Sequence, residues 1–252
     1  MSLLNTIEKP KERPVMVTIC GDAGMGKTSL AATFPKPIFI RAEDGLQAIP
    51  LEHRPDAFPE LTSFDDLMQQ LTALVKEPHD YQTCVIDSIS KLDILLQSEL
   101  RRKENKENLA QCGGGFGGGF EIIAGQHQTV RRAAAAMQRR GMHVVFLAHA
   151  DVETLKIPDA DDYMRWTLRM GHKKSLPPYV EDVDVVGFLT LEKFVKGDDG
   201  RVKRAVSTGD RELICHAVAS NVSKNRYGIT DAIPVKLGEN PLARFIPALG
   251  GV

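Results

Sequence analysis

Short apolar runs rich in β-branched residues recur along the first 150 residues and alternate with stretches of helical spacing. The strand-like runs are Val15 to Cys20, Pro37 to Arg41, Thr83 to Asp87 and His143 to Ala148. Between them, apolar residues at three- and four-residue spacing predict helices over 64–76 and 121–140. Strands that alternate with helices form parallel sheets with right-handed crossovers. The pattern predicts an α/β fold with a mainly parallel central sheet flanked by helices.

After residue 180 the pattern changes to longer extended segments. Val183 to Lys196 is typical of one long strand, and the G-D-D-G of residues 197–200 is typical of a turn. Extended patterning resumes over 201–207 and again over 212–220. We therefore expect antiparallel strands appended to the C-terminal edge of the parallel core.

Two stretches show no regular period and are expected to be long loops. Residues 113–119 read G-G-G-F-G-G-G, which offers few side chains for packing and predicts a mobile loop. In residues 151–169, Pro158 and the acidic cluster at 159–162 interrupt any helix. Long loops inside a compact domain are usually functional or disordered.

Composition sets broad limits on the class of protein. A chain of 252 residues with 42% hydrophobic content can bury one substantial core. We expect an N-terminal tail over 1–14, one domain over 15–235 and a C-terminal tail over 236–252. Basic and acidic residues nearly cancel, 32 against 33, so any nucleic-acid surface must be a local patch.

The cysteines and the apolar runs bear on the compartment. The four cysteines are widely spaced without a C-x-x-C pair, which favours reduced core residues over a metal site. No apolar stretch approaches the roughly 20 residues that a membrane helix needs, and the first ten residues do not resemble a signal peptide. We expect a cytoplasmic protein with no membrane partner.

The segment from Gly21 to Thr28 reads G-D-A-G-M-G-K-T and lies between a predicted strand and a predicted helix. It fits G-x-x-x-x-G-K-[ST], in which the glycines let successive backbone N–H groups face a phosphate. Lys27 is then expected at the β- and γ-phosphates, and the Thr28 hydroxyl at Mg²⁺. ATP is expected to contact Gly21, Asp22, Ala23, Gly24, Met25, Gly26, Lys27, Thr28 and Ser29.

Asp87 ends the apolar run C-V-I-D and is the expected carboxylate partner of the metal, together with Thr28. An aspartate after a strand is also a frequent helix cap. Ser88, the next residue, could provide that cap instead.

Three features resemble the RecA-like ATPases. Glu43, just past the second predicted strand, resembles the glutamate that activates the attacking water, with Asp44 as the rival candidate. Its strand is expected beside the P-loop strand. V-I-D-S-I-S-K-L, around Asp87, resembles the metal-binding strand of that family. His149, at the end of H-V-V-F-L-A, resembles the polar sensor between the γ-phosphate and a DNA-binding loop, although a purely structural histidine is the alternative.

Near the end of the chain, residues 223–228 read S-K-N-R-Y-G. This resembles motifs of bacterial RadA and of DnaB-like helicases, in which lysine and arginine reach the γ-phosphate bound by a neighbouring subunit. The resemblance implies that Lys224 and Arg226 act in the site of another copy, where a guanidinium stabilises developing charge. A basic surface turn is the alternative.

The chain is most similar to the short, core-only RecA-like ATPases of bacteriophages that act in single-strand annealing and recombination, over roughly residues 14 to 230. The resemblance implies a RecA-like P-loop NTPase fold and a homo-oligomer, either a filament or a ring. No F-x-x-A tether is found in residues 1–14, so the mode of assembly stays open.

RecA-like proteins bind single strands through loops that follow the metal-binding and sensor regions, and both places here are irregular and basic. Cations interleaved with aromatic rings suit a sequence-tolerant single-strand site. The candidate DNA-binding residues are Phe116, Phe120, Arg165, Trp166, Arg169, Lys173 and Lys174. The alternatives are a solvated basic face, a core Trp166, and a role for Lys173 and Lys174 in a neighbour's ATP site.

These features predict a Mg²⁺-dependent ATPase, stimulated by single-stranded DNA, that promotes annealing or homologous recombination. Expected partners are single-stranded DNA, further copies of the chain and a single-strand-binding protein, in the host cytoplasm if the gene belongs to a phage. A hexameric helicase or packaging motor is the alternative on the same core. A small-molecule P-loop kinase is a third, but the glycine-rich loop and the K-N-R-Y-G segment argue against it.

Overall fold

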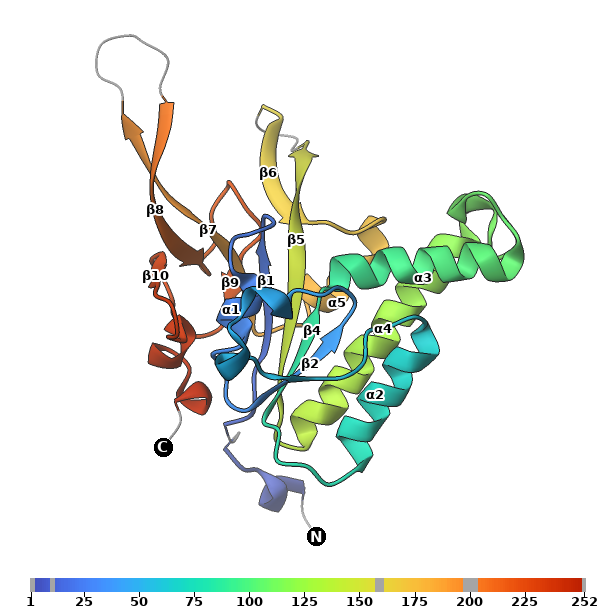
Figure 1. Ribbon diagram of the computed structural model, residues 1–252, viewed down its shortest axis with the longest axis horizontal. Coiled ribbons are helices and arrows are strands. Elements are labelled where there is room, and N and C mark those ends of the chain that lie inside the picture. Colours follow the sequence, from blue (N-terminus) through green and yellow to red (C-terminus); the bar gives the residue numbers. More distant parts are fainter. Residues whose placement is uncertain (1–2, 10–11, 157–160, 197–203, 251–252) are drawn as a thin grey trace.

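A computed structural model describes residues 3–9, 12–156, 161–196 and 204–250. Within these ranges the strands form one ten-stranded sheet, whose main path runs β10-β8-β7-β1-β5-β4-β2-β3 (Figure 1). The strands of the parallel part are β1 Met16–Gly21, β2 Pro37–Arg41, β3 Asp56–Ala57, β4 Thr83–Asp87, β5 His143–Leu155 and β7 Val185–Lys196. The predicted mainly parallel α/β architecture is confirmed.

The predicted antiparallel strands lie at the C-terminal edge. They comprise β8 Arg204–Ile214 on β7 and β10 Ile233–Val235 on β8, while β9 Lys224–Asn225 pairs with the beginning of β7. The two extended segments expected over 201–207 and 212–220 are instead one strand, β8, as far as residues 204–214 show. The G-D-D-G turn predicted at 197–200 lies outside the described residues.

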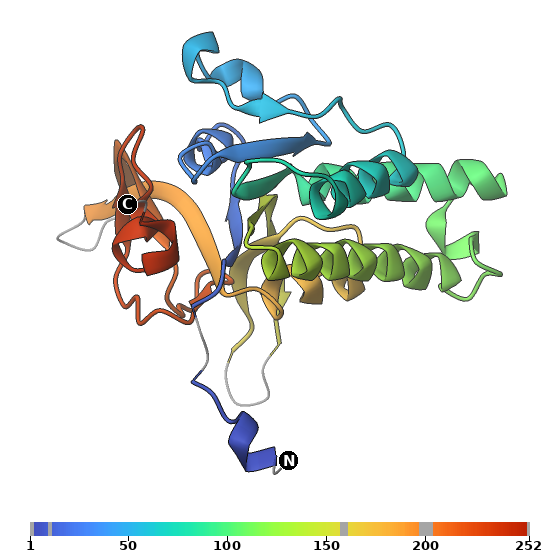
Figure 2. The ribbon, with the colours of Figure 1, turned by 90° about the horizontal axis from the view of Figure 1, so that it is seen from below.

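Helices cover both faces of the sheet. They are α1 Lys27–Ala31, α2 Phe64–Lys76, α3 Ile89–Glu104, α4 Gly118–Arg139 and α5 Pro177–Val180. Helices α2, α3 and α4 lie together on one side (Figure 2), and α3 and α4 extend beyond the sheet. Alternate residues of β1 divide between two cores: Met16 and Cys20 face α2 to α4, whereas Val17 and Ile19 face α1.

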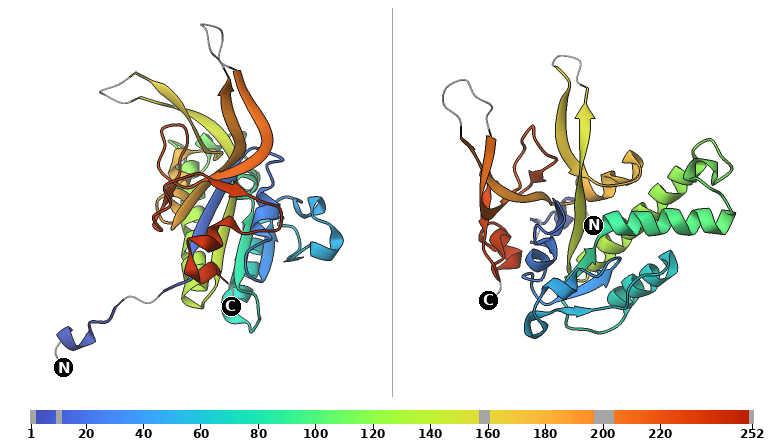
Figure 3. Two further views of the ribbon diagram at one scale, coloured as in Figure 1. Left: turned by 90° about the vertical axis from the view of Figure 1, so that its left-hand side faces the viewer. Right: turned by 45° about the horizontal axis from the view of Figure 1, so that its top comes forward.

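The four cysteines are buried free thiols, so their interpretation as core residues is confirmed. The segment after β10 also packs on the body: Leu242, Ile246 and Leu249 are buried in the core that contains α1. The amino-terminal 3-10 turn Leu3–Thr6 instead extends away from the body (Figure 3) and is exposed.

Two hairpins project from the edge of the sheet where the parallel strands end (Figure 1). One is β7–β8. The other joins β5 to β6, Tyr163–Leu168, with register from Ala150↔Leu168 to Leu155↔Tyr163. The prediction of a long loop over 151–169 is therefore wrong, because Tyr163–Leu168 form a strand that pairs with the extended β5.

The glycine segment 113–119 is only partly a loop. Gly118 and Gly119 form the first turn of α4. A Cβ on Gly119 would lie 2.1 Å from the Leu109 carbonyl oxygen, so glycine allows this turn to pack closely on the preceding 3-10 turn. The prediction of an entirely irregular segment was wrong at this end.

Candidate nucleotide-binding site

The predicted P-loop connects β1 to α1. Gly24 and Gly26 have φ of 77° and 90°, a conformation that other residues rarely adopt. Lys27 is buried, and its Nζ donates to the carbonyl oxygens of Gly21 and Asp22, both at 2.9 Å. Burial lowers the pKa of this ammonium. The loop thus holds a cation at its centre, while Asp22, Ala23 and Gly24 remain exposed.

Thr28 and Asp87 meet beneath the loop. The Thr28 hydroxyl donates to Asp87 Oδ2 at 2.8 Å. Asp87 is buried, and burial raises the pKa of its carboxyl to about 6, although the Thr28 hydrogen bond acts in the opposite direction. A hydroxyl beside a desolvated carboxylate is a donor set that suits Mg²⁺. These two residues therefore fit the predicted metal site.

Glu43 lies beside this pair, although the strand arrangement that places it there differs from the predicted one. The strand β2 is separated from β1 by β5 and β4, so the expectation that it would be adjacent to the P-loop strand was wrong. The Ala42 and Glu43 amides instead donate to the Asp87 carbonyl oxygen at 2.7 and 3.2 Å. This backbone contact between the ends of β2 and β4 brings Glu43 close to Thr28 and Asp87.

The Glu43 carboxylate is held by two side chains. Its Oε1 accepts from Ser88 Oγ at 2.5 Å and lies 2.8 Å from His149 Nε2. Partial burial alone would raise the pKa of Glu43, but the hydrogen bonds of His149 and Ser88 outweigh burial and lower it. Glu43 is therefore ionised at neutral pH.

Ser88 and His149 connect this carboxylate to α3 and β5. The Ser88 Oγ accepts from the Lys91 amide, so Ser88 caps α3 as the sequence suggested. His149 pairs with Gly21 in the β1–β5 register, and its amide donates to Ser90 Oγ at 3.0 Å. Beyond His149, β5 leaves the core of the sheet and enters the projecting hairpin.

Lys224 and Arg226 do not lie near the P-loop of their own chain. Asn225 pairs with Val185, which is aligned with Val17, so the K-N-R segment is about four residues of β1 from Gly21. At strand rise this is on the order of 13 Å. Arg226 Nη1 lies 3.2 Å from Asp184 Oδ1, and Lys224 Nζ donates to the Glu181 carbonyl oxygen at 2.5 Å.

The structure brings two of the predicted DNA-binding segments together. The Phe120 ring stacks on His172, with centroids 4.6 Å apart. Lys174 forms an ion pair with Glu121, and Lys173 is exposed beside it. The start of α4 and the basic segment 169–174 thus form one surface. Phe116, at the tip of the glycine segment, is fully exposed.

Arg165 and Trp166 lie apart from that surface, on β6. Arg165 Nε lies 2.6 Å from Glu153 Oε1 on the paired strand. The Trp166 ring is partly buried, and its centroid lies 5.9 Å from that of Phe188. This partial burial agrees in part with the alternative that Trp166 is a core residue. The described part of this hairpin also carries Asp151, Asp161 and Asp162. Arg169 is exposed at the base of the hairpin.

Sequence reasoning missed three residues of this region. A Cβ on Gly45 would lie 2.8 Å from both Asp87 Oδ2 and Thr28 Oγ1, so only glycine leaves that pair undisturbed. Asp184 accepts from the Met16 amide and pairs with Arg13 and Arg226. Arg211, on β8, lies beside Gly26. Gly45 is close to Glu43 in sequence, but no pattern marks the other two.

A P-loop with its lysine lies on a mostly parallel sheet, beside a hydroxyl–carboxylate pair that suits a metal and an ionised glutamate. These features define a P-loop ATPase. The sequence model of the AAA domain family matches residues 13–227, and the chain belongs to this family. Among the described residues, no helix combines the length and apolar character needed to cross a bilayer.

The chain is also similar to individual proteins. It is 24% identical over 177 residues to the SPbeta prophage-derived uncharacterized protein YorG of Bacillus subtilis (strain 168), and the match covers 69% of this chain and 50% of YorG. The matched region thus spans half the length of that relative. A KaiC-like protein of the archaeon Pyrococcus horikoshii OT3 is similar in structure, with a TM-score of 0.47, 13% identity and coverage of 91% and 88%.

Proposed function

We propose that this protein is a Mg²⁺-dependent ATPase that assembles as a homo-oligomer on single-stranded DNA and promotes annealing or recombination. The observation that carries the proposal is the position of His149. Its side chain contacts Glu43, and its strand continues into the hairpin that leads to the basic segment 169–174. A ligand on that surface is therefore connected to the catalytic carboxylate through one residue.

Glu43 is the proposed general base for the attacking water. Its Oε1 is engaged by Ser88 and His149, whereas no donor within the described ranges reaches Oε2. Oε2 can therefore accept a proton from water while Oε1 stays fixed. Loss of the His149 contact would turn the carboxylate, which makes His149 the proposed link between DNA and hydrolysis.

Lys27, Thr28 and Asp87 are the proposed phosphate and metal residues. Lys27 would exchange its two carbonyl contacts for the β- and γ-phosphates. Thr28 and Asp87 would hold Mg²⁺, which when bound neutralises charge on the transferred phosphoryl group. A cavity of about 480 Å³ adjoins α1 and is lined by Ser29, Thr33, Ile49 and Leu237, among others, so it offers a mostly apolar place for the base.

Single-stranded DNA is the proposed partner because cations and an exposed ring share the surface around the start of α4. Arg169 and Lys173 provide exposed cations, and Phe116 provides an exposed ring for stacking. The similarity to a prophage-derived protein supports a phage role, with the host cytoplasm as the compartment and a single-strand-binding protein as a further partner.

Assembly is proposed because Arg226 cannot serve its own P-loop. Its side chain is 56% exposed although it pairs with Asp184, so it is accessible to another copy. In a filament or ring, Lys224 and Arg226 would then approach the phosphates held by the neighbour.

The first test is ATP hydrolysis with and without single-stranded DNA. We expect DNA to stimulate hydrolysis, and Lys27→Ala and Arg226→Ala to abolish the stimulated rate. Glu43→Gln should lower kcat by about 10²- to 10⁴-fold. Arg244→Ala, an exposed arginine on the C-terminal segment, is the matched control and should behave as wild type. Hydrolysis that is independent of DNA and normal in Arg226→Ala would contradict the proposal.

A binding measurement tests the DNA surface directly. Phe116→Ala should raise the Kd for a fluorescent oligonucleotide by about tenfold, because stacking of one base is lost. Leu51→Ala, which removes an exposed apolar side chain elsewhere, serves as the control. Equal affinity of both variants for the oligonucleotide would remove this surface from the proposal.

A further inference from the structure

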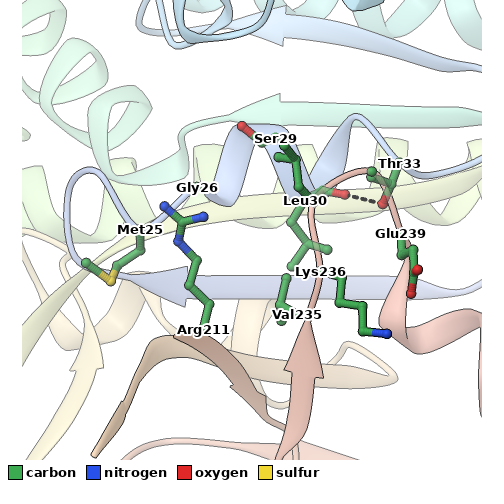
Figure 4. Close-up of a pocket in the computed structure, with 11 residues that line it drawn as sticks. Met25, Gly26, Ser29, Leu30, Thr33, Arg211, Val235, Lys236 and Glu239 are labelled. Carbon is green, nitrogen blue, oxygen red and sulfur yellow. Dashed lines mark hydrogen bonds between the residues drawn. The ribbon is translucent and has the colours of Figure 1, made fainter. Parts of the chain in front are cut away.

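Arg211, on β8, directs its guanidinium at the P-loop (Figure 4). A Cβ built on Gly26 would lie 3.7 Å from Arg211 Cζ and 3.8 Å from its Nε and Nη1. Arg211 shares a small pocket with Met25, Gly26, Ser29 and Leu30 of the loop and α1. A strand appended to the edge of the sheet thus places a cation beside the phosphate-binding loop of the same chain.

The backbone of Arg211 is fixed from both sides. It is aligned with Leu191 of β7 on one side and with Val235 of β10 on the other. A residue in the middle strand of three has little freedom to shift along the sheet. The sheet, rather than a loose loop, therefore sets the backbone position from which Arg211 reaches Gly26.

Among the described residues, Arg211 also has no counter-charge. Within the described part of the chain, no carboxylate forms an ion pair with it and no hydrogen bond to its guanidinium is found. By contrast, Arg13, Arg41, Arg165 and Arg244 each pair with an acid. An unpaired guanidinium next to an anion-binding loop has five donors available for a phosphate.

The position on α1 indicates which phosphates are within reach. Thr28 meets Asp87 on one flank of α1, and this flank marks the metal and the γ-phosphate. Arg211 lies on the other flank, beside Gly26 and Ser29. The backbone amides of the loop cradle the α- and β-phosphates.

We infer that Arg211 binds the α- or β-phosphate of the nucleotide held by its own chain, as a second cation besides Lys27. This inference rests on the proposed binding of ATP. The inference extends that proposal, because it makes β8 part of the nucleotide site and adds an arginine from the same chain. The ligand class is a nucleoside di- or triphosphate.

Calorimetric titration with Mg-ADP and with Mg-ATPγS tests the inference. Arg211→Ala should raise the Kd for both nucleotides by about tenfold, since a charge-assisted phosphate contact is lost and the γ-phosphate is not involved. The Kd of Arg211→Lys should lie between those of wild type and Arg211→Ala, because lysine keeps the positive charge but lacks the forked pair of N–H donors of the guanidinium. Arg244→Ala is the control for loss of an exposed arginine and should bind as wild type.

Mixing separates a contact in cis from one in trans. Lys27→Ala lacks a working loop but carries an intact Arg211, so an equimolar mixture with Arg211→Ala should recover no site of wild-type affinity. Recovery, wild-type binding by Arg211→Ala, or a loss confined to Mg-ATPγS would each overturn the inference. If the wild-type protein binds neither nucleotide, the proposed ATPase function itself fails, which is a different outcome.

Discussion

Asp87 is buried between β4 and the P-loop, and burial raises the pKa of its carboxyl to about 6 from an ordinary value of 3.8. At pH 8 the folded protein must hold this group ionised in a poorly solvated place, which costs about 1–3 kcal/mol relative to the unfolded chain. Asp87→Asn should therefore raise the melting temperature in EDTA. Mg-ADP should stabilise the wild type more than the variant, because only the wild type keeps the carboxylate. A lower melting temperature of Asp87→Asn in EDTA would contradict this account.

Gly45 is required for steric reasons and not for its backbone conformation, since its φ is −83°. A methyl group there would press on Asp87 Oδ2 and Thr28 Oγ1 together. Gly45→Ala should raise the Mg²⁺ concentration for half-maximal hydrolysis by about tenfold, as displaced metal-binding residues typically do. A magnesium titration of the ATPase rate measures this, and unchanged half-saturation would show that the pair can shift freely.

At the scale of residues, the sequence allows prediction of the site residues that end or directly follow a strand. Glu43, Asp87 and His149 each end or follow an apolar run, and parallel strands gather such positions at one edge. Arg211 and Asp184 could not be found in this way. The position of Arg211 depends on the antiparallel pairing of β8 with β7, and that of Asp184 on the register of β7 beside β1. Neither pairing leaves a local pattern in the sequence.

Among the elements, α3, α4 and α5 are joined by a buried polar network. His127 on α4 lies 2.9 Å from Asp93 Oδ1 on α3 and 2.8 Å from the Tyr179 hydroxyl on α5. Asp93 Oδ2 also accepts from the Gly171 amide at 2.8 Å. The network thus ties the helical layer to the basic segment 169–174.

His127→Leu should lower the free energy of unfolding by about 2–4 kcal/mol, because Asp93 and Tyr179 each lose a partner inside the core. Urea denaturation measures the change. Gly125→Ala on the same helix should do the opposite and stabilise by about 0.5–1 kcal/mol, since its Cβ would meet nothing within 4 Å. A neutral His127→Leu would mean that the network carries no net stability.

The β5–β6 hairpin shows where reading of elements from sequence failed. Its acids and Pro158 suggested a loop, yet Ala150, Leu168 and Thr167 are buried and start the hairpin inside the molecule. Trp166 then packs toward Phe188 of β7. Burial against a strand distant in the chain, rather than local propensity, fixes this element. Helices α2 and α4, whose apolar spacing is long and regular, were predicted to within a few residues.

At the scale of the whole molecule, His143 joins the beginnings of the two central strands β1 and β5. Its Nδ1 accepts from the Val15 amide at 3.0 Å, which joins β5 to the start of β1. Burial lowers the pKa of His143 from its ordinary value of 6.5, while a backbone hydrogen bond with Ala248 acts in the opposite direction. The folded state therefore favours the neutral ring. This contribution to stability is complete above pH 6.5 and is lost as the pH falls toward the lower folded value.

Unfolding by urea from pH 8 to pH 5 tests this link. The wild type should lose stability below pH 6.5, and His143→Asn should lose less, because asparagine can accept from Val15 without titrating. His53→Asn, at an exposed histidine, should follow the wild-type curve. Identical pH profiles for wild type and His143→Asn would exclude His143 as a source of acid sensitivity.

Asp184 binds several groups of its own chain at once. It accepts the Met16 amide and is shared by Arg13 and Arg226, at 2.8 and 3.2 Å. If Arg226 turns toward the phosphates of a neighbouring copy, Asp184 still keeps Arg13 and the amide. In the proposed oligomer the buried acid would then always keep a cation, so copies of the chain could join and separate while each stays folded. Arg226 would then exchange partners, from Asp184 in the free protomer to the neighbour's phosphates in the oligomer, and return when the copies separate.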